Sequence, residues 1–552
     1  MERGVSFLGL VVLMGLAYVF SKHRTQIKYR TIVWGVGLQL LFATIILGTG
    51  NLSFAGIFVF AFLINLYLFE EELAQRRVSI WLLGAGVLAG SAVLVFALYH
   101  LAAFGVTLAL LLAALVTAAV AGKLGRAQVS RLAVSATLLL GLAELWHRQV
   151  DGRAVFKTLS DGVASFLGLS SEGAWFLFRT LVQGENAAPR GDFPGFGFQF
   201  AFSVLPTIIF FSAFISVLYY FGIVQAVISA IARFMHWSMK TSGSETTSCS
   251  GNIFVGQTES PFLIKPFLKD MTISELHAVM VGGFATVAGG VLAAYIGMGV
   301  DAGHLLAASV MSAPAALVMA KLLYPETEHS VTAGDVEIPE IETADNVIEA
   351  AANGTTDGLK LALNVGAMLI AFIALIAVLD SILGYFDGIV DGQVLAAILP
   401  ESWAQSLGVG QTTEFVKDSG KVVVEHSGLF PGSMRTLFGT LLAPLAFIMG
   451  VPWADAGAVG NLLGIKLTIN EFVAYGTLSQ HIAAADIGAR SQIIATYALC
   501  GFANFSSIGI QIGGIGALAP ERRAELAKVG LRAMCGGALA SFMTATIAGI
   551  LL

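Results

Sequence analysis

Long apolar runs separated by short charged segments constrain this chain more than any other feature. Twelve runs approach the roughly 20 residues that a helix needs to cross a hydrocarbon core of about 30 Å. They lie at residues 5–20, 31–48, 55–69, 79–99, 104–121, 130–146, 198–220, 275–300, 303–323, 358–383, 488–516 and 530–551. A further run at 434–450 contains Pro444 and fits either an interfacial helix or a span.

The distribution of charge supports the same interpretation. Only 12% of the 552 residues are charged, whereas a soluble protein of ordinary composition carries about 25%. Nearly all of these charges fall between the apolar runs. Because a charge at the centre of a bilayer costs about 2.5–3.5 kcal/mol, the pattern predicts an all-α, multi-pass integral membrane protein.

Several other classes of protein are disfavoured by residue type and spacing. A formal net charge of -6 indicates no basic surface for nucleic acid. Cys249, Cys500 and Cys535 form no CxxC motif, and the nine histidines form no HExxH pair. We therefore expect no disulfide framework, no resident cofactor and no catalytic metal. The first apolar run lacks a basic leader and a cleavage site, so it is interpreted as a retained span.

Short basic loops predict the orientation, because such loops stay on the cytoplasmic side. They follow the first, third and fifth apolar runs, and another precedes the last run; the residues are Lys22, Arg24, Lys28, Arg30, Arg76, Arg77, Lys123, Arg126, Arg131, Arg522, Arg523, Lys528 and Arg532. We therefore predict an external N-terminus in the inner (plasma) membrane of the cell.

Two polar stretches interrupt the apolar pattern. Residues 326–357 contain many carboxylates and no Lys or Arg, and the alternation of spans places them in the cytoplasm. A solvated linker is the expected structure there, with binding of Ca²⁺ or a partner as the alternative. Residues 384–433 are expected to be external.

Two further segments carry small, polar and acidic residues at membrane depth. They are residues 241–269, which include GNIFVGQTESP, and residues 464–480, which read GIKLTINEFVAYGTLSQ. Irregular backbone is tolerated at that depth only where protein buries it or where it lines a wet cavity. The first segment is entered from the cytoplasmic side and the second from outside, and Val291 lies 32 positions after Glu259 while Asn504 lies 33 after Glu471. This predicts an inverted repeat with two re-entrant helical hairpins.

Glu259 and Glu471 are the acidic residues at the centre of these segments. A single carboxylate of this kind is often only a helix cap or an ion-pair partner, but two of them beside amide and hydroxyl side chains indicate a binding site. Asn504 and Ser507 share a helix face in GFANFSSIGIQIGG, with Ser506 beside them. Carboxylate, amide and hydroxyl groups together suit a neutral solute that carries hydroxyls or a heterocycle. A membrane hydrolase with Glu259 and Glu471 as paired carboxylates is the enzyme alternative, and no other catalytic group supports it.

At these residues the chain resembles the concentrative nucleoside transporter family, whose signature GxKxxxNEFVAY stands unbroken at residues 464–475. The blocks FSVLPTIIFFSAFISVLYY, GGFATVAGGVLAAY, LKLALNVGAMLIAF, CGFANFSSI and LAPERR are also similar to the family. The similarity covers residues 1–50 and 155–552.

The resemblance implies cation-coupled symport of nucleosides by a homotrimer, in which a transport domain moves like an elevator against a scaffold domain. It assigns nucleobase contacts to Gln257, Thr258 and Glu259, with Val291 packing on the base. It assigns the ribose to Glu471, Asn504 and Ser507, with Phe502 at the gate. Sodium would be held by Asn252, Thr286 and the carbonyls of Val255 and Val287. A proton as the coupling ion and a passive facilitator remain the alternatives.

The predicted organisation follows from these observations. Residues 1–50 form the first two spans, 51–150 an inserted bundle of about four spans, 155–323 the first half of the core with hairpin one at 241–270, 324–357 the acidic cytoplasmic loop, and 358–552 the second half with hairpin two at 455–487. The inserted bundle departs from the family pattern, and we expect it at the periphery of the scaffold, with lipid contact or support of the trimer as its role. Purine or pyrimidine preference is left open.

Overall fold

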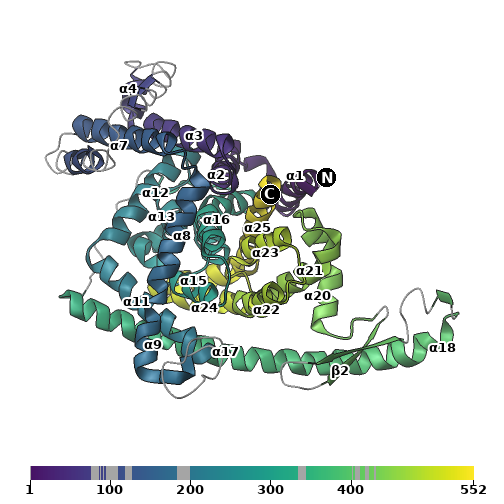
Figure 1. Ribbon diagram of the computed structural model, residues 1–552. Helices are drawn as coiled ribbons and strands as arrows, with labels where there is room; N and C mark the ends of the chain where they lie inside the picture. Colours follow the sequence, from purple (N-terminus) through teal and green to yellow (C-terminus); the bar gives the residue numbers. More distant parts are fainter. Residues whose placement is uncertain are drawn as a thin grey trace.

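The computed structural model describes residues 2–75, 127–182, 199–333, 344–400, 402–403, 411–416, 422–427 and 430–552, with short pieces between 86 and 118. Within these residues the chain is almost wholly helical, as predicted (Figure 1). The exception is a two-stranded antiparallel hairpin of β1 (Gln411–Val416) and β2 (Val422–Ser427), in which Gln411 pairs with Ser427.

Nine of the helical segments in the described part of the chain are long and apolar enough to cross a membrane. They are α1 (Glu2–Val19), α2 (Tyr29–Leu47), α3 (Asn51–Leu68), most of α7 (Ala127–His147), Ala201–Tyr220 with α11 (Leu205–Tyr220), α14 with α15 (Ile273–Ala285 and Gly289–Gly297), α16 (Ala302–Leu323), Ile373–Ile398 with the end of α17 (Val347–Ile389), and Pro520–Leu551 with α25 (Arg523–Leu551). Eight of them match a predicted run closely, whereas Ile373–Ile398 overlaps the predicted run at 358–383 only in part. The predicted run at 79–99 lies mostly outside the described residues, and of the run at 104–121 the described residues 110–118 are helical.

One predicted span has a longer break than the span of α14 and α15. Residues 488–516 form two shorter helices, α23 (Ala489–Leu499) and α24 (Phe505–Leu518), separated by a break at residues 500–504. Asn504 causes the restart, because its side chain accepts a hydrogen bond from Ser507 N at 2.9 Å and so caps α24. Hydropathy alone does not reveal this break, because Gly501 and Ala503 within it are not polar.

The central helices form two units with the same order of elements. The first repeat consists of α12 (Ile223–Met239), α13 (Gly243–Gly251), the 3₁₀ helix η3 (Ser260–Asp270), α14, α15 and α16. The second repeat consists of α20 (Met434–Ile448), α21 (Trp453–Thr468), α22 (Glu471–Ala484), α23, α24 and α25. In each repeat a short helix leads into a hairpin, then into a broken helix and a long helix. Hairpin one comprises α13 and η3, and hairpin two comprises α21 and α22.

Local sequence explains where the hairpin limbs begin and end. Ser242 and Glu245 form a capping box at the start of α13, and Thr272 and Glu275 form another at the start of α14. The second limb of hairpin one is a 3₁₀ helix with Pro266 inside it, where an α-helix would lose a hydrogen bond. Asn470 caps α22 by accepting from Val473 N at 2.9 Å.

The two repeats bury their long helices against each other at the centre of the molecule (Figure 1). Of the apolar window in α16, 89% is buried, whereas the window in the α17 region is only 6% buried. α17 packs along α11 and runs past the edge of the core, together with η4 (Val390–Leu395) and α18 (Ala396–Ile398). α17 begins at Val347, eleven residues before the predicted span at 358, so the last part of the predicted acidic loop is helical.

The inserted segment lies at the periphery of the described structure. α3 packs on α2 and α12 through aromatic side chains, with ring centroids 5.6 Å apart for Phe42 and Phe60 and 6.1 Å apart for Phe60 and Phe234. α7 lies on α3, where Ser135 donates to Asn65 Oδ1 at 2.5 Å. These contacts tie the insertion to α2 and to α12, the first helix of the first repeat.

The remaining helical elements connect these units. They are η1 (Arg24–Gln26), α4 (Glu70–Ala74), α8 (Gly152–Gly168), α9 (Ser170–Phe178), η2 (Arg179–Val182), α10 (Phe200–Ser203) and η5 (Pro520–Arg522). The two termini lie close together, because Arg3 donates to the carbonyl of Leu552 at 3.0 Å.

Candidate functional site

The breaks of the two interrupted helices meet at the centre of the molecule. Phe502 N, in the break between α23 and α24, donates to the Thr286 carbonyl, in the break between α14 and α15, at 3.2 Å. Gly501 has a φ of +144°, and a Cβ there would stand 2.7 Å from the Phe284 carbonyl. Glycine is therefore needed at position 501, because no side chain fits between the two breaks.

Glu471 is the most deeply placed carboxylate of the site, with 4% of its surface exposed. Tyr295, on α15, donates to Oε1 at 3.1 Å, and Asn504 donates through Nδ2 to Oε2 at 3.1 Å. The carboxylate stands at the first residue of α22 and beside the cap of α24. Two helix N-termini therefore face it, and their unpaired N–H groups and dipoles favour its negative charge.

A line of polar side chains on α24 continues from this carboxylate to hairpin one. Ser507 is 2% exposed, and Gln257 of hairpin one donates to its hydroxyl at 3.4 Å. Gln511, one turn further along α24, donates to Gln257 Oε1 at 3.0 Å and to the Met280 carbonyl at 3.1 Å. Gln257 from the first repeat and Ser507 from the second are thus in direct contact.

Thr258 and Glu259 complete the polar part of hairpin one. Thr258 donates to Glu259 Oε1 at 3.2 Å, and the Glu259 side chain is exposed where Glu471 is buried. A Cβ on Gly256 would stand 2.2 Å from Glu259 Oε2. The missing side chain at Gly256 therefore makes room for the Glu259 carboxylate.

The two apolar site residues lie in the same region. Val291, on α15, is 4% exposed and lies one turn before Tyr295. Phe502 is partly buried, packs against the core, and is held by its backbone bond to the break of α14 and α15.

The four predicted cation ligands surround the ends of α13 and α14. Asn252 is the C-cap of α13 and Thr286 is the C-cap of α14. Asn252 Oδ1 accepts no hydrogen bond from the described residues, although the side chain is only 1% exposed. The Thr286 hydroxyl donates to the Gly282 carbonyl at 3.2 Å, and a Cβ on Gly282 would stand 3.3 Å from Asn252 Nδ2. Both side chains therefore flank one glycine.

This donor set fits a monovalent cation. Val255 is 5% exposed and Val287 is fully buried, so their backbone oxygens are shielded from bulk water. All four ligands would be uncharged oxygens, and within the described residues no group of three or more His, Cys, Asp or Glu is placed to hold a metal. The orphaned Asn252 oxygen and the negative ends of two helices favour a positive charge at this point.

Tyr295 and Gln511 belong to the site but were not singled out from the sequence. Gln511 lies seven positions after Asn504 and four after Ser507, so it continues the same helix face, and this spacing would have identified it. Tyr295 stacks on Tyr475 with centroids 4.2 Å apart. Its contact with Glu471 joins residues 176 positions apart, which no local pattern reveals.

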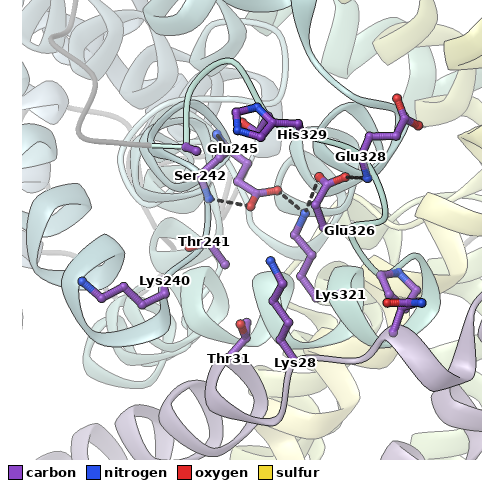
Figure 2. A pocket seen from close by; sticks show the side chains of 14 residues that line it. Lys28, Thr31, Lys240, Thr241, Ser242, Glu245, Lys321, Glu326, Glu328 and His329 are labelled. Carbon is purple, nitrogen blue, oxygen red and sulfur yellow. Dashed lines mark hydrogen bonds and ion pairs between the residues drawn. The ribbon is translucent and has the colours of Figure 1, made fainter.

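A polar cavity of about 260 Å³ lies at the opposite end of α13 (Figure 2). Figure 2 shows Lys321 directed at Glu245 and Glu326; its Nζ lies 2.6 Å from Glu245 Oε2 and 3.7 Å from Glu326 Oε2. The nine residues of α13 separate this cavity from Asn252 by about 14 Å. The cavity is therefore outside the candidate binding site.

The same cavity changes the interpretation of the acidic stretch. Ser330 donates to Glu275 Oε1 at 2.5 Å, and Gly243 N donates to the Thr332 carbonyl at 2.9 Å. Residues 325–333 are thus packed on the base of hairpin one, where a solvated linker was expected. Residues 334–343 lie outside the described structure.

Comparison with known proteins places the chain in a family. The models for the "Na+ dependent nucleoside transporter" N-terminus and C-terminus match residues 8–66 and 304–549, and the "nucleoside recognition" Gate model matches residues 201–302. An uncharacterized transporter of Haemophilus influenzae is 40% identical over 415 residues, which cover 74% of this chain and 88% of that protein. The chain belongs to the concentrative nucleoside transporter family.

Further relatives agree with this membership. Mouse sodium/nucleoside cotransporter 1 is 41% identical over 426 residues, which cover 73% of this chain and 57% of the mouse protein. The chain thus spans little more than half the length of that relative. A solved structure of the concentrative nucleoside transporter CNTnw, described as inward-facing and substrate-bound, matches with a TM-score of 0.70 and 31% identity over 100% of this chain and 98% of that one. An outward-facing structure of the same transporter, from a variant, matches at 0.69 with 30% identity, over 100% and 98% of the two chains.

Family membership confirms the predicted resemblance and the predicted fold class. It places the chain among transporters, so the hydrolase alternative is dropped. The stretch between the first two matched regions, residues 67–200, is covered by none of the three family models and contains most of the predicted insertion.

Proposed function

We propose that this protein is a symporter that carries nucleosides into the cell, driven by a sodium gradient. The observation that carries the proposal is the contact between the two helix breaks, which brings Gln257 of the first repeat against Ser507 of the second and places Glu471 beside Asn504. The named relatives that cotransport sodium and nucleosides support the same substrate and ion.

The polar groups suit a nucleoside because each is hydrogen-bonded to another side chain and can exchange that bond for one to the substrate. Glu471 and Asn504 bond each other and would turn to the ribose hydroxyls, which match a carboxylate and an amide. The amide of Gln257 bonds Ser507 and Gln511 and would turn to the donors and acceptors of the base. Val291 would pack on the face of the base, and Thr258 and Glu259 would complete its edge contacts.

We further propose that Asn252, Thr286 and the carbonyls of Val255 and Val287 bind the sodium ion. Bound there, the ion would neutralise the negative ends of α13 and α14 and hold the tip of hairpin one against α15. That tip is already close, since a Cβ on Gly289 would stand 2.8 Å from the Phe254 carbonyl. An ordered tip keeps Gln257 in place, which would couple the affinities for ion and nucleoside in both directions.

For the movement, we propose an elevator in which the two repeats move together past a scaffold that contains α11 and α17. These two helices pack along each other, and α17 keeps large apolar side chains exposed in the single chain, such as Ile370 at 77% and Tyr385 at 67%. Such a surface suits contact with lipid and with other protomers in a homotrimer. Native mass spectrometry of the detergent-solubilised protein tests the trimer, and a single-chain mass would reject it.

The decisive experiment is uptake into liposomes that contain the purified protein. Labelled uridine and adenosine are offered with an inward sodium gradient, with an inward proton gradient, or with neither. We expect uptake that requires the sodium gradient. Uptake that follows protons alone would keep nucleoside transport but reject the Asn252 and Thr286 site, and uptake without any gradient would indicate a facilitator. A cysteine introduced next to Glu2 tests the proposed orientation in the inner membrane. It should be accessible from outside the cell if the N-terminus is external.

A further inference from the structure

The second repeat contains a place equivalent to the proposed sodium site of the first. In order along the chain, α13 corresponds to α21, η3 to α22, α14 to α23 and α15 to α24. The proposed sodium ligands stand where the first hairpin limb ends, at Asn252, and where the first half of the broken helix ends, at Thr286. The corresponding ends in the second repeat are those of α21 and α23.

A buried lysine occupies that place. Lys466 lies in the last turn of α21 and has no exposed surface. Its Nζ donates to the Ala498 carbonyl at 2.8 Å, and Ala498 lies in the last turn of α23. The last four carbonyls of a helix have no partner within it. The Lys466 ammonium therefore bonds a carbonyl in the last turn of α23, while the lysine itself is part of the last turn of α21.

The surroundings of Lys466 differ from those of an ordinary buried ion pair. Within the described part of the chain, no carboxylate oxygen lies within 4.0 Å of its Nζ. The nearest compensation is the carbonyl of Ala498, the negative ends of two helices, and the ring of Phe542, whose centroid is 5.6 Å away, and the Glu471 carboxylate also attracts the ammonium from beyond 4.0 Å. These are the interactions that a bound inorganic cation would make at the same point.

We propose that the Lys466 ammonium is the tethered cation of the second repeat and does there what a free sodium ion does in the first. It holds the end of α21 to the end of α23. Asn470 and Glu471 follow the end of α21, and Asn504 follows the end of α23. Lys466 is accordingly a positioning residue, which keeps Glu471 and Asn504 in reach of the ribose without a second free ion.

This inference rests on the proposed function, because it takes the first-repeat site to be the sodium site. It adds that the two symmetry-related places together bind only one free cation, because Lys466 supplies the second positive charge. It also predicts that removal of the ammonium creates a place that a small soluble cation can fill.

The test uses uridine affinity of the purified full chain at saturating sodium, measured by isothermal titration. Lys466→Ala removes the side chain and leaves space, whereas Lys466→Met keeps the apolar stem without the charge. We expect both substitutions to weaken uridine binding by about tenfold or more. Ethylammonium chloride should restore Lys466→Ala towards wild-type affinity, and choline chloride at equal ionic strength should not. Lys466→Met should not respond, because the thioether fills the space.

Lys321→Ala is the matched control, because it also removes a buried ammonium from the core, but one that is paired with carboxylates. Ethylammonium should leave its uridine affinity unchanged. Wild-type uridine affinity for Lys466→Met would overturn the proposal, whether or not Lys466→Ala folds. Weak binding by Lys466→Ala that neither ethylammonium nor raised sodium restores would also overturn it. If uridine binding by the wild-type protein does not depend on sodium, the proposed sodium site is rejected. The ethylammonium result still reports on Lys466 in that case.

Discussion

The first and second repeats follow the same order of elements, but they treat positive charge in opposite ways. The first repeat keeps its buried lysine at the base of hairpin one, where Lys321 is paired with Glu245 at 2.6 Å, and at the end of α13 it leaves Asn252 Oδ1 without a partner among the described residues. The second repeat carries its buried lysine at the end of α21, where Lys466 bonds the Ala498 carbonyl at the end of α23. The first repeat is thus open to a cation, and the second already contains one.

The carboxylates show the complementary difference. Glu471 is buried between two helix N-termini and is held by Tyr295 and Asn504, whereas Glu259 is exposed and its side-chain donor is its neighbour Thr258. Anion and cations are therefore separated by helix polarity, with the carboxylate at N-terminal ends and the cations at C-terminal ends. Because of this difference in helix polarity, one repeat suits an ion and the other suits a ribose, although both have the same order of elements.

The largest expected effect concerns the lysine at the base of hairpin one. Lys321→Met should lower the free energy of unfolding by about 3–5 kcal/mol, because it leaves the Glu245 carboxylate buried without its partner. Denaturant unfolding of the detergent-solubilised protein measures it. Lys360→Met is the control, since Lys360 pairs with Asp357 on the surface and should contribute at most about 1 kcal/mol. Equal effects of the two substitutions would contradict the anchoring role of Lys321.

A second prediction compares the two carboxylates. Glu471→Gln should weaken uridine binding by about 10- to 100-fold, because the ribose loses a charged hydrogen-bond acceptor. Glu259→Gln should weaken it less, since that side chain is exposed. Isothermal titration at saturating sodium measures both. A larger loss for Glu259→Gln would reverse the assignment of ribose and base between the repeats.

The third prediction separates the ion site from the nucleoside site. Thr286→Val should lower the apparent sodium affinity by about tenfold and leave uridine affinity at saturating sodium nearly unchanged, because a hydroxyl ligand is lost without change of shape. Sodium titration of uridine binding measures it. Thr496→Val is the matched control in the second repeat, where the hydroxyl also bonds the carbonyl four residues earlier. If both substitutions shift the sodium titration equally, the site is not at Thr286.

The smallest expected effect tests the tyrosine pair behind Glu471. Tyr295→Phe should weaken uridine binding by about three- to tenfold, because the Glu471 carboxylate loses one of its two side-chain donors. Tyr475→Phe removes the hydroxyl of the stacked partner, which bonds the Thr496 carbonyl at 2.8 Å and not Glu471. Binding titrations that rank Tyr475→Phe above Tyr295→Phe would show that stacking, and not the bond to Glu471, matters here.

Much of this architecture was predictable from local pattern. Nine predicted spans are present because a bilayer demands about 20 apolar residues in each. The hairpins lie where small and polar residues interrupt the apolar runs, and Asn504 and Ser507 share a helix face as their spacing indicates. The break in 488–516 escaped prediction because apolar residues surround it, and only the cap at Asn504 reveals it.

The sequence by itself determined that the chain is a membrane protein, which segments are irregular at membrane depth, and which family it belongs to, because hydropathy, polar interruptions and motifs are local properties. The tertiary structure decided which of those segments meet. The bonds from Tyr295 to Glu471, from Gln511 to Gln257 and from Lys466 to Ala498 each join separate elements of the fold. Their partners are set by the packing of the two repeats, and that packing places the carboxylate at helix N-termini and the lysine at helix C-termini.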